Sequence, residues 1–197
     1  MKKPLNYQCS EYDCGPTAIL NAISCLFEAE DFPPLFIKVI NSYCMDNCNC
    51  NGMPCVYGTS RDALRFVAAW INNYAFNTGF KLHCVCTEGA AVNLGVDSEL
   101  SQCLRSGGTA VVNCMLEDIF HYITLTGLKE DRVGVFDPYY DERDNMGKGV
   151  ECIDDHPMEY NRLVEKTVLD SIDGRDYSMH VLKDRIALCF YRTDKKL

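Results

Sequence analysis

The chain has 197 residues, which is enough for one domain with a substantial hydrophobic core and a small appendage. Its composition, 47% hydrophobic and 24% charged, is that of a globular protein and argues against a disordered one. A formal net charge of -9 argues against a nucleic-acid partner, because binding a polyanion normally requires a basic face.

The sequence favours a cytoplasmic location. Met1, Lys2 and Lys3 resemble the charged start of a secretion signal, but polar residues follow before an apolar run can form. No stretch approaches the roughly 18 apolar residues that predict a membrane span. The thirteen cysteines are an odd number and lie below the density of a disulfide scaffold, so we expect them to be mostly reduced.

The first third of the chain predicts three helices, because apolar residues recur there at helical spacing. Pro16 suits the first turn of the first helix, where a missing N–H is tolerated, and Ser60 is a suitable cap for the third. A loop rich in Cys, Asn and Gly separates the second helix from the third. The helices are expected over residues 14–29, 34–43 and 61–74.

The rest of the chain predicts mainly strands, because its apolar runs are short, β-rich and separated by turn residues. Strands are expected over residues 81–86, 109–115, 122–126, 132–136 and 186–191. Further helices are expected over residues 96–104 and 160–172, and residues 141–157 are polar and irregular.

Helices followed by an antiparallel sheet imply an α+β fold, with the N-terminal helices packed on the sheet. We expect residues 1–140 to form the core of a single domain. Residues 141–197 would then be a C-terminal extension that packs on this core or caps it.

Cys14 is placed to act as a nucleophile. A thiol attacks as its thiolate, so a catalytic site must lower a thiol pKa that starts at about 8.5. The start of a helix does this with its partial positive charge and its unpaired N–H groups. Cys14 lies where the first helix is expected to begin, and we expect Gly15 to leave its sulfur unobstructed. Cys9 lies before the helix and lacks both advantages.

A base and its orienting carboxylate are predicted on neighbouring strands. His121 heads one β-rich run, and Asp137 follows the next. If Leu128 pairs with Arg132, His121 lies opposite Tyr139, and Asp137 is a diagonal neighbour on the same face, roughly 7–8 Å away. An imidazole oriented by a carboxylate is the base of a catalytic triad. A slip of one residue would place the two side chains on opposite faces.

Gln8 is the candidate donor to an oxyanion. Its neutral amide lies a few residues before the nucleophile, and the backbone N–H of Cys14 would supply a second donor. Loss of one such donor typically adds about 2.7–4 kcal/mol to the barrier of an acyl-transfer reaction. A glutamate at this position would instead repel the developing negative charge.

Together these residues resemble the bacteriocin-processing peptidases. This papain-like family includes stand-alone enzymes and cytosolic domains fused to ABC exporters, and its members cut leader peptides after a double glycine. The resemblance rests on Gln8, on residues 13–17, on His121 at the start of an apolar strand, and on Asp137 followed by proline. A glutamine six residues before the cysteine is also the spacing of papain. The resemblance covers about residues 7–140.

The resemblance implies a stand-alone, papain-like cysteine peptidase that uses no cofactor and acts on a peptide or protein substrate through a thioester. In it, Cys14 is the nucleophile, His121 the base, Asp137 the orienting residue and Gln8 the oxyanion donor. Phe120 stands where family members usually have glycine. Nothing in the chain resembles the transporter or ATPase portions, and the C-terminal extension lies outside the resemblance.

Two alternatives to hydrolysis stay open. The same residues catalyse acyl transfer when an amine or a thiol replaces water, so an acyltransferase or transpeptidase is the first alternative. A non-catalytic protein that binds peptides or zinc is the second. Four thiols in the cysteine-rich loop could satisfy tetrahedral zinc, but their spacing fits the usual paired pattern poorly, so we expect no metal. These thiols belong to Cys44, Cys48, Cys50 and Cys55.

Overall fold

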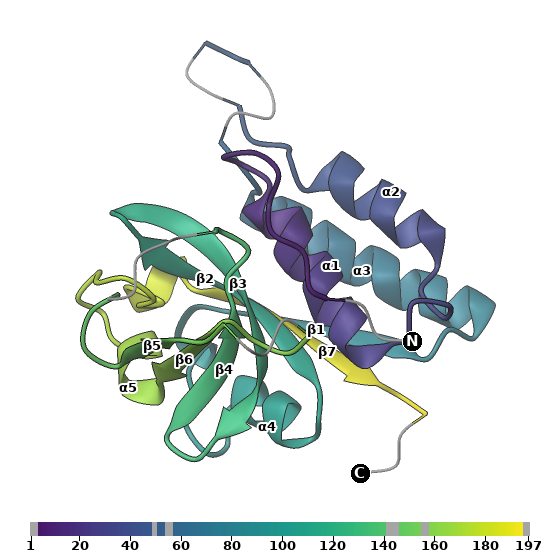
Figure 1. Ribbon diagram of the computed structural model, residues 1–197. Coiled ribbons are helices and arrows are strands. Elements are labelled where there is room, and N and C mark those ends of the chain that lie inside the picture. The colour runs from purple at the N-terminus through teal and green to yellow at the C-terminus, as the bar shows by residue number, and fades with distance from the viewer. Residues whose placement is uncertain (1–3, 49–50, 54–56, 141–145, 155–157, 195–197) are drawn as a thin grey trace.

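A computed structural model describes residues 4–48, 51–53, 57–140, 146–154 and 158–194. Figure 1 shows three helices packed together on one side of a strongly twisted sheet. These are α1 (Cys14–Leu26), α2 (Pro34–Tyr43) and α3 (Arg61–Thr78). Within the described ranges, no helix is both long and apolar enough to cross a bilayer.

The strands of the described residues form one sheet in the order β1-β7-β2-β3-β4-β6-β5, and every neighbouring pair is antiparallel. Helices on an antiparallel sheet confirm the expected α+β class. The strands are β1 (Leu82–Glu88), β2 (Thr109–Leu116), β3 (Ile119–Lys129), β4 (Arg132–Phe136), β5 (Val150–Cys152), β6 (Arg162–Glu165) and β7 (Ile186–Arg192). The short helices are η1 (Gly89–Ala91), α4 (Glu99–Arg105), α5 (Lys166–Leu169) and η2 (Leu182–Asp184).

The C-terminal part of the chain supplies the strands β5, β6 and β7. β7 lies between β1 and β2, while β6 pairs with β4 and carries β5 on its outer side. The helix expected over residues 160–172 is wrong, because its first part is β6 and only α5 is helical. Pairing with β4 satisfies the backbone of β6, which overrides an apolar spacing that is compatible with a helix.

Two threonines of the sheet hold α1 in place. The Thr124 hydroxyl of β3 donates to Ala18 O at 2.9 Å, and the Thr109 hydroxyl of β2 donates to Ala22 O at 2.8 Å. The two carbonyls are one helical turn apart, so these bonds fix both the position and the direction of α1 along the sheet. Buried apolar residues of α1, α2 and α3 fill the space between this layer and the sheet.

Successive side chains of β3 alternate between two cores, as the period of a strand requires. Tyr122 belongs to the core beneath the helices, and its hydroxyl donates to Thr59 O at 3.3 Å. Ile123 and Leu125 belong to a second core on the other face of the sheet, which α4 and α5 help to close. His121 has the same parity as Ile123, so it lies on the face that the C-terminal segments cover.

Arg185 fastens the segment between α5 and β7 to the rest of the fold. Its guanidinium is 1% exposed and donates to the carbonyls of Val92, Asp170, Ser171 and His180. It also donates to the Asp170 carboxylate at 3.1 Å. Only the planar fork of an arginine offers enough donors for this set of acceptors.

We predict that Arg185→Met lowers the free energy of unfolding by about 3–5 kcal/mol, because it leaves a carboxylate and several carbonyls without their donor. Urea denaturation measures the change. Arg175→Met is the matched control: Arg175 is half-exposed and pairs with Asp173 on the surface, so its loss should cost less than about 1 kcal/mol. Equal midpoints for the two variants would contradict the prediction.

Candidate active site

Cys14 is the first residue of α1 and is 7% exposed. The first N–H groups of a helix have no partner within the helix, and its start carries partial positive charge. Asp13 precedes the helix but does not cap it, since its carboxylate accepts from Cys9 N and Ser10 N, both at 3.0 Å. The sulfur therefore lies at a helix start whose positive end is not neutralised by a side-chain cap.

His121 is 5% exposed, and its Nε2 lies 2.7 Å from Oδ1 of Asp137, which is 1% exposed. The thiol of Cys14 lies beside the imidazole and helps to raise its pKa. Because Asp137 occupies Nε2, Nδ1 is the nitrogen left to face the sulfur. The structure therefore joins Cys14, His121 and Asp137 in one row, in the order predicted from the sequence.

The register that brings His121 to Asp137 differs from the assumed one. Leu128 pairs with Val133, and not with Arg132 as expected, so the assumption is wrong at the turn. A bulge between Leu125 and Gly127 then shifts the pairing by one residue, and Thr124 pairs with Phe136. Beyond the bulge the assumed register holds, which places Asp137 on the same face as His121.

The two ionisable groups stabilise each other's charge. Burial lowers the pKa of His121, but the charge of Asp137, its hydrogen bond and the contact with Cys14 outweigh burial and raise this pKa to about 10. Burial raises the pKa of Asp137, but His121, the hydroxyl of Tyr177 and the N–H of Tyr139 lower it overall. An imidazolium beside a carboxylate is therefore the favoured state at neutral pH.

Gln8 lies beside the end of β4. Its backbone N–H donates to Pro138 O at 2.8 Å, and its side-chain Nε2 donates to Ser10 O at 2.8 Å. The segment that carries Gln8 runs back along α1, where Asn6 exchanges two hydrogen bonds of 2.8 Å with the buried Asn21. These bonds tie the expected oxyanion donor to both the helix of Cys14 and the strand end of Asp137.

Gly15 makes room for Thr59. A Cβ added at Gly15 would lie 2.7 Å from Thr59 Cβ and nearer still to its hydroxyl oxygen. That hydroxyl donates to Cys44 O, and Thr59 O accepts from Tyr122. The close approach of Thr59 thus joins the loop before α3 to the start of α1.

Three residues at the site were missed in the sequence: Asn161, Arg162 and Tyr177. Asn161 accepts from Asp137 N and donates to Asp137 O, both at 2.8 Å. The Tyr177 hydroxyl donates to Asp137 Oδ2 at 2.7 Å, and the buried Arg162 places its charge near both Tyr177 and Asp137. No motif or spacing marks these residues, since only the fold brings β6 and the segment before β7 to the end of β4.

The cysteine-rich loop is described only in part. Burial, with the neighbouring Asp46, raises the pKa of the Cys44 thiol to about 12, and Cys48 lies near Asp46 O. Cys50 and Cys55 lie outside the described residues. Among the residues that are described, no group of three or more His, Cys, Asp or Glu side chains could hold a metal ion.

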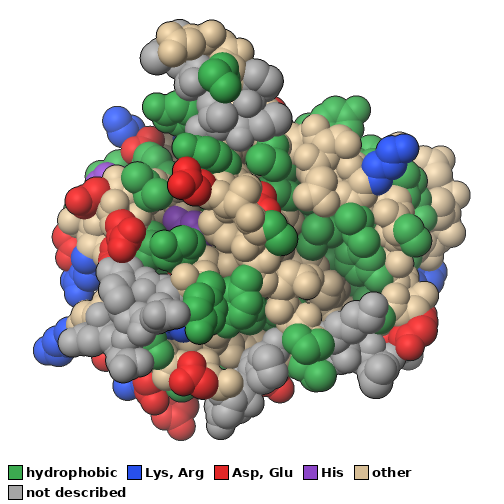
Figure 2. Space-filling model, turned by 45° about the horizontal axis from the view of Figure 1, so that its top comes forward, with side chains coloured by type: hydrophobic (Ala, Val, Ile, Leu, Met, Phe, Trp, Pro, Cys, Tyr) green, Lys and Arg blue, Asp and Glu red, His purple; other side chains and the backbone are tan. Residues whose placement is uncertain are grey.

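The face that carries the start of α1 is shown in Figure 2, where hydrophobic side chains lie on both sides of a histidine, with acidic ones nearby. Tyr7, Phe120, Tyr139 and Tyr140 are exposed aromatic residues close in the chain to Gln8, His121 and Asp137. The Tyr139 ring lies edge-on to the His121 ring, at 6.4 Å between centroids. The Tyr139 ring therefore gives the candidate site an apolar border.

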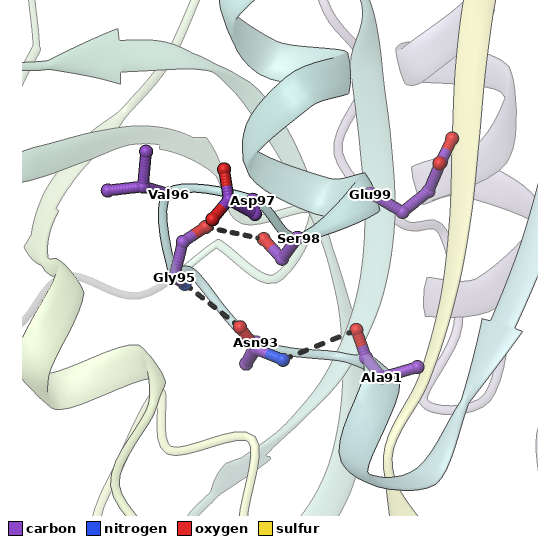
Figure 3. Close-up of a pocket in the computed structure, with 7 residues that line it drawn as sticks. All are labelled: Ala91, Asn93, Gly95, Val96, Asp97, Ser98 and Glu99. Atoms are coloured by element: carbon purple, nitrogen blue, oxygen red, sulfur yellow. Dashed lines mark hydrogen bonds between the residues drawn. The ribbon is translucent and has the colours of Figure 1, made fainter.

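An open hollow of about 520 Å³ lies elsewhere, along residues 91–99 before α4 (Figure 3). Its polar groups bond to one another: Gly95 N donates to Asn93 Oδ1, and the Ser98 hydroxyl donates to Gly95 O. It contains no nucleophile paired with a base, so it is not a competing active site.

Comparisons with known proteins do not assign the chain to a family. No family model and no curated protein sequence matches the chain. A solved structure described as "Crystal structure of a double glycine motif protease from AMS/PCAT transporter in complex with the leader peptide" is 14% identical, with a TM-score of 0.47. The match covers 96% of this chain and 91% of that one. At this level the likeness assigns neither family nor activity, so the function must be argued from the chain's own residues.

We predict that Gly15→Ala lowers the free energy of unfolding by about 1–3 kcal/mol, because the added methyl group must displace Thr59. This loss of stability is opposite in sign to the gain that usually follows when alanine replaces glycine in a helix. Gly127→Ala is the control, since an added Cβ there meets no atom within 4 Å. A Gly15→Ala variant that resists urea as well as the wild type would show that Thr59 moves freely.

The raised pKa of His121 predicts a loss of stability at alkaline pH. The folded protein keeps this proton up to about pH 10, whereas the unfolded chain releases it near 6.5, so the stabilisation is complete below about 6.5 and disappears between these values. Cys14→Ala removes the titration of the thiol. At low pH, Cys14→Ala should therefore be more stable than Cys14→Ala/His121→Gln. As the pH rises from about 6.5 to about 10, this difference in unfolding free energy should narrow by up to about 1.4 kcal/mol per pH unit. A difference that is independent of pH would refute the pairing.

Proposed function

We propose that the chain is a papain-like cysteine peptidase that hydrolyses peptide bonds with Cys14 as its nucleophile. The observation that carries the proposal is the row of three buried groups: a thiol at a helix start, an imidazole beside it, and a carboxylate 2.7 Å from Nε2 of that imidazole. A nucleophile, a base and a group that orients the base are the parts that acyl transfer requires.

In the first half of the reaction, the Cys14 thiolate attacks the carbonyl carbon, and a C–S bond forms as the carbonyl electrons move to oxygen. Nε2 of Gln8 and the N–H of Cys14 would donate to the resulting oxyanion. The tetrahedral intermediate then collapses. Nδ1 of the His121 imidazolium gives its proton to the leaving nitrogen, and the C–N bond breaks to leave a thioester.

In the second half, water attacks the thioester carbon and gives a proton to Nδ1 of His121. The C–S bond breaks, the acid leaves, and the thiolate and imidazolium return. Asp137 stays ionised throughout and holds the ring through Nε2, so that Nδ1 faces the sulfur in both halves of the cycle. No step requires a cofactor.

The proposed substrate is a peptide or a protein. The exposed Tyr139 ring beside His121 offers apolar surface to a peptide chain, whereas the net charge of -9 disfavours a polyanion. We also propose that the protein acts in the cytoplasm, since its buried cysteines include free thiols, as expected in a reducing compartment; among these are Cys44, Cys84, Cys103, Cys114 and Cys189.

We predict that Cys14→Ala lowers the hydrolysis of peptide-library substrates by at least about 10³-fold and abolishes iodoacetamide labelling at this position, because no other group can form the thioester. Mass spectrometry of the products and of the labelled protein measures both effects. Cys9→Ala is the matched control, since Cys9 is an exposed thiol five residues earlier and should be dispensable.

Three results would overturn parts of this proposal. Wild-type hydrolysis by Cys14→Ala would exclude the nucleophile. Products joined to an added amine, in place of free acid, would show an acyltransferase with the same machinery. A Cys14 that reacts no faster than a simple thiol, in a protein that binds peptides intact, would indicate a non-catalytic binding protein.

A further inference from the structure

The carboxylate of Asp137 is held by more than the histidine. Oδ1 lies 2.7 Å from His121 Nε2 and accepts from Tyr139 N at 2.8 Å, and Oδ2 accepts from the Tyr177 hydroxyl at 2.7 Å. Both oxygens therefore have donors, and those donors come from different parts of the fold. Without the bond to Oδ2, the carboxylate could turn about its Cβ–Cγ bond and present either oxygen to His121.

Tyr177 is itself fixed from several sides. Its side chain is 0% exposed, and the charge of Arg162 acts on it from β6. Its backbone N–H donates to Met115 O at 2.7 Å, and Met115 N donates to Ser178 O at 2.8 Å. Tyr177 thus extends the end of β2 and reaches across the second core to the end of β4.

The backbone of Tyr177 is strained. Its φ is 66°, a value that is unfavourable for a bulky residue of this kind and that persists only where the surroundings impose it. The segment that imposes it is the one that Arg185 fastens. A strained, fully buried tyrosine whose hydroxyl ends on the orienting carboxylate indicates a role at the site beyond packing.

We propose that Tyr177, supported by Arg162, is a positioning residue of the active site, which holds the Asp137 carboxylate so that Oδ1 stays on His121 Nε2. This inference rests on the proposed function for its catalytic meaning. Two hydrogen bonds, from the Tyr177 hydroxyl to Asp137 and between Asp137 and His121, form the centre of a row, with Arg162 beside Tyr177 at one end and Cys14 beside His121 at the other. Arg162 and Tyr177 come from the C-terminal extension, outside the part of the chain that carries the family resemblance.

The charges around Asp137 favour this role. Burial, and then the charge of Asp137, raise the pKa of Tyr177 above its ordinary value, so its hydroxyl stays protonated and donates. Burial raises the pKa of the nearby Cys114 thiol, which therefore stays neutral. The titratable and charged groups that face Asp137 from the surrounding elements are His121, Tyr177, Arg162 and Cys114, with Cys14 beyond the imidazole.

Tyr177→Phe tests the proposal, because it removes one hydroxyl and keeps the ring. We predict that the pKa of the Asp137 carboxyl rises by about one unit, since a hydrogen bond to its charged form is lost. The rate of Cys14 alkylation by iodoacetamide should fall about tenfold, with its acid limb moved to higher pH. The carboxyl carbon of Asp137, labelled with ¹³C and assigned with Asp137→Asn, reports the first effect without requiring catalysis.

Tyr191→Phe is the matched control. Its hydroxyl also donates to a carboxylate, that of Glu99 at the start of α4, which is not part of the row from Tyr177 to Cys14, so both readouts should match the wild type. If Tyr177→Phe does not fold, replacement of Tyr177 by 3-fluorotyrosine decides the matter. A fluorinated phenol is a stronger donor, so the pKa of Asp137 should then fall and the acid limb of alkylation should move to lower pH.

A Tyr177→Phe protein that melts earlier, but titrates and alkylates as the wild type does, would reduce Tyr177 to a packing residue and overturn the proposal. The proposal would also be overturned if the pKa of Asp137 changed in Tyr177→Phe while the rate of Cys14 alkylation stayed the same at every pH. If both readouts move as predicted but no peptide is hydrolysed by the wild type, the proposed peptidase function fails and the positioning role stands.

Discussion

The hydrogen bond between His121 and Asp137 constrains the rest of the structure, because it spans two neighbouring strands and exists only in one register. A strand slipped by one residue turns every side chain to its opposite face. The bulge between Leu125 and Gly127 sets that register at the site end of the sheet. The turn after β3 can therefore close with one pairing while the end that carries the candidate site keeps another, so the bulge helps to form the site although it lies several residues away.

The local elements of this site could be predicted from the sequence. Helical spacing and Pro16 located the start of α1, which begins at Cys14, and turn residues delimited β4 at its observed bounds. The relation of His121 to Asp137 came from an assumed register that is wrong at Leu128 and right beyond the bulge. A bulge without a clear sequence signal cannot be predicted from alternation alone. The predicted relation of His121 to Asp137 is therefore right only because the bulge cancels the error of one residue at the turn.

The C-terminal contributions could not be predicted, for a physical reason. Tyr177 and Arg162 meet Asp137 only because β6 pairs with β4 and the segment before β7 extends the end of β2. These are contacts between distant segments, and no local spacing encodes them. The helix that we expected over residues 160–172 made these contacts still harder to predict, because it would have placed Arg162 on a helix and not beside β4. A buried polar cluster is assembled by topology, whereas propensity describes only the pieces.

The start of α1 lacks the side-chain caps that stabilise α3 and α4, and bonds elsewhere along α1 hold it in place. Ser60 caps α3 and Ser98 caps α4, and both helices carry an acidic residue in the first turn. α1 has neither feature, and the carboxylate of Asp13 closes the preceding loop instead. An absent cap typically costs a helix about 1 kcal/mol, and the hydroxyls of Thr109 and Thr124 offset this by fastening α1 to the sheet. The N–H groups that a cap would have occupied thus stay available where negative charge would develop, and the packing of the helix supplies the stability that its end gives up.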